Sequence, residues 1–168
     1  MAQLTARPDR SEPIRSRPQM PAGYGLPQDS AGMFEWADLR EPLETAQTYW
    51  VATTRPDGRP HAVPLWGAWL EDAFYFEVSP ETRRGRNLAL NPAVVVHVER
   101  ENLAIMIEGD AEVITPDAAL DGKLGDTFEA KYRYRPDASQ PWHIVRPRKV
   151  LAWAAFPTTP TRFSFGDA

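Results

Sequence analysis

One short stretch near the middle of the chain gathers positive charge, although the formal net charge of the protein is −4. The segment VSPETRRGRNLALNP, residues 78–92, holds three arginines in four positions, Arg83, Arg84 and Arg86, just after a strand-like run. Guanidinium groups bind phosphate through two parallel hydrogen bonds. The free N–H groups and the dipole of a helix's first turn also attract anions. The stretch therefore predicts a phosphate site at the start of a helix.

The helix that carries these arginines has clear expected start and stop signals. Ser79 is the expected N-cap, a proline follows it, and an Asn-Pro pair ends the helix. The hydroxyl of Thr82 can donate one hydrogen bond to a phosphate. Asn87 lies one helical turn after Arg83 and can share its face. The spacing leaves a second interpretation open, namely a solvated helix face with surface ion pairs.

Other residue types with catalytic potential show no comparable pattern. The chain has no cysteine, which excludes disulfides, thiolate metal sites and a cysteine nucleophile. The three histidines, His61, His97 and His143, are far apart and lack metal-ligand spacing, so no metal site is expected. Neither a nucleophile–base triad nor a pair of carboxylates stands out, and no catalytic residue is assigned.

The rest of the chain predicts short strands joined by tight turns. Strand patterns cover residues 48–55, 60–70, 73–78, 93–99, 103–114, 142–156 and 161–165. Asp-Gly and Glu-Asp turns join the first three, which are expected to form an antiparallel meander. Pro64 places its part of the second strand at an edge or a bulge, or where the backbone is left free. The pattern favours a mainly β protein that forms a closed or partly closed barrel.

Two further helices and an N-terminal arm complete the expected organisation. Residues 34–47 predict a helix that is short or broken by Pro42, and residues 115–132 a helix weakened by glycines. Residues 1–33 contain five prolines and are expected to form an extended or disordered arm, whose apolar knot Tyr24–Pro27 is a candidate for docking on the body. Residues 34–168 are then one domain.

Charge and composition exclude some classes of partner. An acidic chain argues against general binding to nucleic acid or to an anionic membrane. No apolar run approaches the roughly 20 residues that span a bilayer, and the first residues lack the apolar region of a secretory signal. We therefore expect a cytoplasmic protein that acts on a small molecule.

Residues 53–99, TTRPDGRPHAVPLWGAWLEDAFYFEVSPETRRGRNLALNPAVVVHVE, resemble the core of the pyridoxamine 5′-phosphate oxidase-like superfamily. Its members are flavin- and deazaflavin-binding split β-barrels. The later run IEGDAEVI extends the resemblance, which covers about residues 48–165. Family members usually carry Ser/Thr-Arg-Lys where this chain has Thr82-Arg83-Arg84. The order and spacing of these elements carry the resemblance.

The resemblance implies a six-stranded split β-barrel that works as a homodimer with two cofactor sites at the subunit interface. The backbone of the second strand would lie along the cofactor ring, the helix start would hold the phosphate, and the C-terminal strands would close over the ring. The implied cofactor-binding residues are His61, Val63, Pro64, Leu65, Trp66, Thr82, Arg83, Arg84, Arg86, Asn87, Trp153 and Arg162. By residue type alone, Trp50 and Trp153 are more typical of a core than of a cofactor lid.

The implied cofactor is a deazaflavin, coenzyme F-420, with FMN as the alternative, and a few relatives bind haem. The helix start is most similar to that of deazaflavin-dependent reductases, and Arg55, Arg59 or Arg86 would suit an anionic tail. Reduced cofactor would deliver hydride to a small organic substrate. The alternative is a non-catalytic carrier of flavin, deazaflavin or haem. Pyridoxamine phosphate oxidation is less favoured, because the oxidases carry further C-terminal sequence and this chain ends at FGDA.

Overall fold

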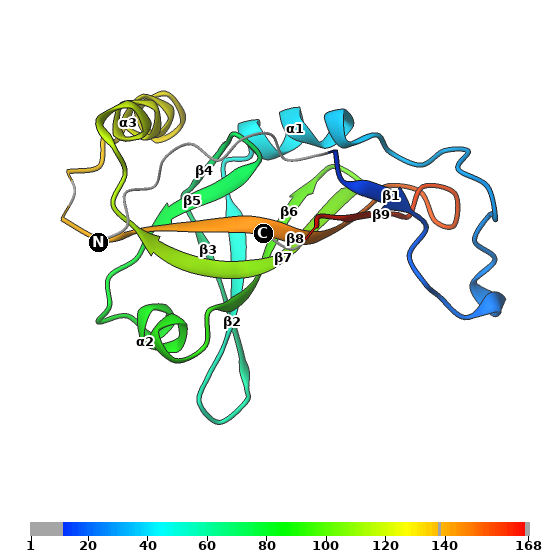
Figure 1. Ribbon diagram of the computed structural model, residues 1–168, viewed down its shortest axis with the longest axis horizontal. Helices are drawn as coiled ribbons and strands as arrows, with labels where there is room; N and C mark the ends of the chain where they lie inside the picture. Colours follow the sequence, from blue (N-terminus) through cyan, green and yellow to red (C-terminus); the bar gives the residue numbers. More distant parts are fainter. Residues whose placement is uncertain (1–11, 138, 167–168) are drawn as a thin grey trace.

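The computed structural model describes residues 12–137 and 139–166 (Figure 1). The described chain is mainly β, and all its strand pairs are antiparallel. The main path of the sheet runs β1-β9-β8-β7-β6-β2-β3, and β4 joins through β5, which pairs with β8. The strands are β1 Ile14–Ser16, β2 Tyr49–Thr54, β3 Pro60–Leu65, β4 Ala68–Leu70, β5 Ala73–Glu77, β6 Ala93–Arg100, β7 Leu103–Ile114, β8 Trp142–Trp153 and β9 Thr161–Ser164. The helices are α1 Trp36–Thr45, α2 Arg83–Leu90, α3 Ala118–Tyr132 and the short 3-10 helix η1 Ala22–Tyr24.

One row of buried side chains runs across the sheet and forms the centre of the core. Val51, Val96, Ile107, Val150 and Phe163 are register neighbours on β2, β6, β7, β8 and β9, and all are buried. Because side chains alternate along a strand, the residues next to them in sequence point to the outer face. The expected split β-barrel is confirmed, and this row fixes which face of each strand is inside.

The prediction of a three-stranded meander is wrong, because the expected second strand, residues 60–70, is divided into two strands, β3 and β4. β2 and β3 pair along their length, but the chain breaks at Trp66 and Gly67 before β4 begins. β4 pairs with β5, and β5 pairs with β8 instead of β3. A Cβ atom at Gly67 would lie 2.3 Å from Cε2 of Phe74 and 2.9 Å from the carbonyl oxygen of Tyr75. Only glycine therefore lets the backbone pass this close to the ring.

Helix α3 is fastened to the barrel at the same break. Lys131 donates to the hydroxyl of Tyr49 at 3.0 Å and to the carbonyl of Gly67 at 3.1 Å. The hydroxyl of Tyr132 accepts from the N–H of Gly67 at 3.1 Å and donates to its carbonyl at 2.9 Å. Burial lowers the pKa of Lys131 to about 8. These bonds hold the end of α3 against the strand break.

The N-terminal segment adds structure that the prolines did not predict. Its strand β1 pairs with β9 at one end of the sheet. The guanidinium of Arg17 donates to four backbone carbonyls in residues 29–31 and 158–160. The ring of Tyr24 meets Phe156 edge to face at 6.0 Å, so the expected apolar knot docks on the body. Helix α1 is short, as expected, and runs unbroken through Pro42.

The close packing at Gly67 predicts a loss of stability on substitution. Gly67→Ala should lower the free energy of unfolding by about 1–3 kcal/mol, because the new methyl group must displace the Phe74 ring or nearby backbone. Urea unfolding followed by tryptophan fluorescence measures this change. Gly122→Ala in α3 is the matched control, since a Cβ atom there meets nothing within 4 Å and alanine favours a helix by about 0.5–1 kcal/mol. Equal losses in both variants would contradict the packing explanation.

Candidate functional site

Helix α2 begins three residues later than expected. Thr82, not Ser79, is the N-cap: its Oγ1 accepts from the N–H of Gly85 at 3.0 Å and donates to the carbonyl of Ser79 at 2.8 Å. The hydroxyl proton of Thr82 is thus already in use, which corrects the expectation that it donates to a phosphate. The N–H groups of Arg83 and Arg84 have no helical acceptor because they lie in the first turn. The helix start therefore still offers donors, but from the backbone.

The three arginines of α2 have different surroundings. Arg83 and Arg86 are exposed, and Arg86 donates to the carbonyl of Glu81. Arg84 is half-buried, its Nε is buried without a hydrogen-bond partner, and burial lowers its pKa. None of the three forms an ion pair with a carboxylate in the described part of the chain. This argues against the interpretation of a helix face held by surface ion pairs.

Two residues of the β2–β3 hairpin complete a cluster of positive charge beside α2. Nδ1 of His61 and Nε of Arg55 are buried without hydrogen-bond partners, as is Nε of Arg84. Burial lowers the pKa of His61, and the charges of Arg55, Arg84 and Arg83 lower it further. We call Arg55, His61, Arg83 and Arg84 the basic corner. Sequence reasoning had assigned Arg55 only to an anionic tail, because nothing in the sequence shows that the end of β2 lies beside α2.

Asn87 plays a different part from the one expected. Its side chain is fully buried, and Nδ2 donates to Oγ1 of Thr53 at 2.9 Å, so it does not share the exposed face of Arg83. Thr53 Oγ1 in turn donates to the carbonyl of His61 at 3.3 Å. This chain of bonds ties α2 to the hairpin. Asn87 is therefore a positioning residue for the basic corner.

Strand β3 ends the main path of the sheet, as Pro64 predicted. Pro64 and Ala62 are exposed. The candidates His61, Val63 and Leu65 alternate with them and are partly buried. Because proline has no N–H, Pro60 and Pro64 must turn their nitrogens toward the unpaired edge. Along β3 this edge therefore offers carbonyl oxygens and a single donor, the N–H of Ala62.

The tryptophans divide between the core and the surface. Trp69 is 1% exposed and belongs to the core, whereas Trp66 is 51% exposed. Trp66 lies beyond the end of β3, where its ring stacks on Tyr132 at 4.8 Å and 10°. The interpretation of Trp50 as a core residue is wrong, because it is 46% exposed. The alternation of β2 places Val51 inside and Trp50 on the outer face.

Trp153 and Arg162 are not brought to the basic corner within one copy of the chain. Trp153 lies at the end of β8 opposite Ala104, and Nε of Arg162 on β9 donates to Oγ of Ser16 at 3.0 Å. In the sheet order β7, β6 and β2 separate these strands from β3 (Figure 1). Whether they join the cofactor site stays a prediction.

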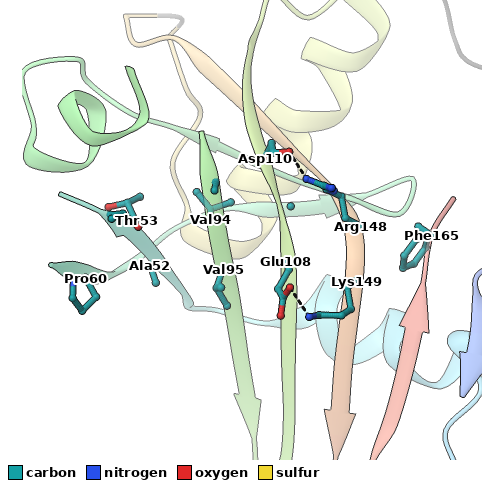
Figure 2. Close-up of a pocket in the computed structure, with 13 residues that line it drawn as sticks. Ala52, Thr53, Pro60, Val94, Val95, Glu108, Asp110, Arg148, Lys149 and Phe165 are labelled. Carbon is teal, nitrogen blue, oxygen red and sulfur yellow. Dashed lines mark hydrogen bonds and ion pairs between the residues drawn. The ribbon is translucent and has the colours of Figure 1, made fainter. Parts of the chain in front are cut away.

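A pocket of about 580 Å³ opens on the outer face of the sheet (Figure 2). Its lining includes Ala52, Thr53, Pro60, Val94, Val95, Glu108, Asp110, Arg148, Lys149 and Phe165. The charged wall is neutralised by two ion pairs, Glu108 with Lys149 at 2.7 Å and Asp110 with Arg148 at 3.1 Å. The basic corner does not line this pocket. Thr53 and Pro60 connect the two, because Thr53 bonds to Asn87 and Pro60 precedes His61.

The described chain is thus a split barrel with a cluster of positively charged side chains at a helix start, and the comparison with known families identifies its family. A family model described as pyridoxamine 5′-phosphate oxidase matches residues 36–154, which is most of the chain. The chain belongs to this family. The resemblance inferred from the sequence is thereby confirmed.

Solved structures with the same fold are varied in their described roles. A conserved hypothetical protein from Mycobacterium tuberculosis is 20% identical, with a TM-score of 0.64 over 77% of this chain and 90% of that one. An F420 reductase is 29% identical, with a TM-score of 0.55 over 66% of this chain and 94% of that one. A haem storage protein from Vibrio cholerae is 19% identical, with a TM-score of 0.53 over 67% and 89%.

One further comparison and two features of the structure give negative findings. No curated protein matches the sequence. Within residues 12–137 and 139–166, no histidine and carboxylate side chains gather in groups that could hold a metal ion. None of the helices described is long and apolar enough to cross a membrane.

The positioning role of Asn87 predicts a structural effect that does not depend on a ligand. Asn87→Ala should lower the free energy of unfolding by about 1–3 kcal/mol, because it breaks a buried hydrogen bond and removes the donor to Oγ1 of Thr53. Urea unfolding without ligand measures this loss. Asn102→Ala, in an exposed turn, should change stability by less than about 0.5 kcal/mol. Unchanged stability of the Asn87 variant would remove the basis for its positioning role.

Proposed function

We propose that this protein is an oxidoreductase that holds coenzyme F-420 or FMN and transfers hydride between it and a small organic molecule. F-420 is the first choice, because an F420 reductase is among the similar structures. The observation that carries the proposal is the basic corner. Three buried nitrogens there, on Arg55, His61 and Arg84, lack a hydrogen-bond partner among the described residues.

A phosphate group fits the chemistry of the basic corner. A buried donor without an acceptor costs about 1–3 kcal/mol, and phosphate oxygens would satisfy the donors of Arg55 and Arg84 through charge-assisted bonds. The exposed guanidinium of Arg83 and the free N–H groups of the first turn of α2 would add to the same site. The carboxylates of this acidic chain do not compete with a phosphate for the basic corner, because none of them forms an ion pair with it in the described structure.

The remaining surfaces around the corner suit a flat ring. When bound, the ring system supplies the hydride chemistry. The unpaired edge of β3 offers backbone acceptors, and Ala52, Val95 and Phe165 give the neighbouring pocket apolar surface. Glu108 and Asp110 are held in ion pairs and are not free bases. The protein's share of the work is then to bind, orient and exclude water rather than to transfer protons.

We further propose a homodimer, in keeping with a partly exposed row on the outer face of the sheet. Trp50, His97, Met106 and Leu151 are register neighbours on β2, β6, β7 and β8. A large side chain such as Trp50 loses exposed apolar area if a second copy covers this face. A second copy is also the means by which remote residues such as Arg162 would reach a cofactor.

A second candidate function is a non-catalytic carrier of haem. His97 and Met106 lie opposite each other on the outer face of β6 and β7, and imidazole and thioether are both ligands of haem iron. A haem storage protein is among the similar structures. The basic corner gives no specific support to this candidate.

Absorption spectroscopy separates the candidates. The purified protein would be titrated separately with F-420, FMN and haem, and any complex with reduced cofactor would be mixed with quinones and enones. Saturable binding of F-420 or FMN with substrate-dependent reoxidation supports the oxidoreductase. Binding of haem alone, with a Soret band, supports the carrier and rejects the oxidoreductase.

The phosphate site predicts a loss of cofactor affinity when its arginines are removed. The double variant Arg83→Ala/Arg84→Ala should bind F-420 or FMN at least about tenfold more weakly, because each charge-assisted hydrogen bond contributes about 1.5–3 kcal/mol. Fluorescence titration measures the dissociation constant. Arg100→Ala/Arg135→Ala removes two guanidinium groups from exposed ion pairs elsewhere and controls for net charge. Wild-type affinity in the first variant would reject the site.

The proposed dimer predicts that a charge on the outer face prevents association. Trp50→Arg should shift the protein from dimer to monomer, because the guanidinium cannot be desolvated against an apolar partner face. Light scattering coupled to size-exclusion chromatography measures the mass. Ala37→Arg adds the same group to an exposed position of α1 and should leave the mass unchanged. A monomeric wild-type protein would contradict the dimer directly.

A further inference from the structure

His61 is the group of the basic corner whose charge can change near neutral pH, because guanidinium groups remain protonated. Arg55 approaches it from the end of β2, and Arg83 and Arg84 approach from α2. Nδ1 of His61 is buried without a partner, while its backbone carbonyl accepts from Thr53. None of the groups that influence the His61 charge in the described structure is a carboxylate.

We propose that His61 takes up a proton when a phosphate group enters the basic corner, so that ligand binding and protonation are coupled. The inference rests on the phosphate site proposed above. It deepens that proposal, because it adds a histidine whose charge depends on pH to arginines whose charge does not.

The protonation state follows from the charges around the ring. Without an anion, burial and the charges of Arg55, Arg84 and Arg83 lower the pKa of His61 below its ordinary value of 6.5, so the imidazole is neutral at pH 7. A bound phosphate brings negative charge within a few ångströms and favours the charged form. In the imidazolium both ring nitrogens are donors, and Nδ1 then has an acceptor. The bound pKa is therefore higher than the free pKa.

FMN and F-420 both carry a phosphate group, but the charge of that group differs between the two cofactors. The phosphomonoester of FMN carries between one and two negative charges near neutral pH, since its second pKa is about 6. The phosphodiester of F-420 carries one. Proton uptake should be greater with FMN than with F-420. Riboflavin, which has the same ring as FMN but no phosphate, should bind without proton uptake.

The other two histidines differ from His61 in their contacts. His143 is buried, its Nδ1 lies 3.3 Å from the carbonyl of Pro141, and its ring packs on Phe76 at 5.3 Å. His97 lies on the outer face of β6, in register with Trp50 and Met106. Because the chain has only three histidines, NMR can follow the His61 signal and compare it with the His97 signal in the same sample.

Calorimetry measures the coupling directly. FMN, F-420 and riboflavin would be titrated at pH 7.5 in phosphate-free buffers of different ionisation enthalpy, which gives the protons taken up per site. We expect uptake of up to about one proton with FMN, and none with riboflavin or in His61→Gln.

Because the bound pKa of His61 exceeds its free pKa, the affinity of the wild-type protein for FMN should fall between pH 7 and 9, by up to about tenfold per pH unit. The affinity of His61→Gln should vary less over this range.

The outcomes separate this inference from the proposed function. If FMN or F-420 binds at the arginines without proton uptake, or if the His61 signal of the wild-type protein does not shift toward imidazolium, the coupling is rejected and the phosphate site stands. If uptake persists in His61→Gln, another group is responsible and the coupling to His61 is rejected. If neither cofactor binds, or if the Arg83→Ala/Arg84→Ala variant binds both normally, the phosphate site and the coupling fail together.

Discussion

The candidate site depends on one constraint: the positively charged side chains of the basic corner must stay close together although their buried nitrogens have no hydrogen-bond acceptors among the described residues. Arg55, His61 and Arg84 each bury a nitrogen atom that has no partner in the part of the chain that the structure describes, and like charges at short range repel one another. Something must hold them in place. The Asn87–Thr53–His61 chain of hydrogen bonds joins α2 to the hairpin, and the buried row through Val51 anchors that hairpin in the sheet. Packing energy from the core thus maintains an electrostatic arrangement that is unfavourable by itself.

The candidate cofactor-binding residues lie in two separate places, the basic corner and the far end of β8 and β9. A single hairpin and the first turn of one helix supply the charged part of the proposed site, so all of its charged groups come from one copy of the chain. The apolar outer face and the residues at the far end of β8 and β9 are open to a second copy. In the proposed function, binding of the charged group and enclosure of a ring would therefore be separate tasks, performed by different faces of the barrel.

Much of the fold follows from local patterns, whereas the site depends on contacts between distant residues. Alternation of apolar residues predicted the long strands, and Pro64 correctly indicated an edge. The helix start was misplaced because Ser79 and Thr82 both have N-cap chemistry. Both hydroxyls accept a backbone N–H, from Glu81 and Gly85 respectively, but the helix begins only after Thr82. Asn87 was read as a surface residue, since its partner Thr53 is 34 positions away. The break at Gly67 likewise depends on the Phe74 ring, which no local pattern reveals.

The two prolines of β3 have a consequence for how copies of this chain can meet. An unpaired strand edge is a template for adding another strand, which leads to domain swapping or cross-β stacking. With nitrogens of Pro60 and Pro64 on that edge, an incoming strand finds acceptors but almost no donors, and a continuous ladder cannot form. The β3 edge thus suits a small molecule with its own N–H groups better than an extended polypeptide, and it disfavours growth of the sheet by strand addition at this end.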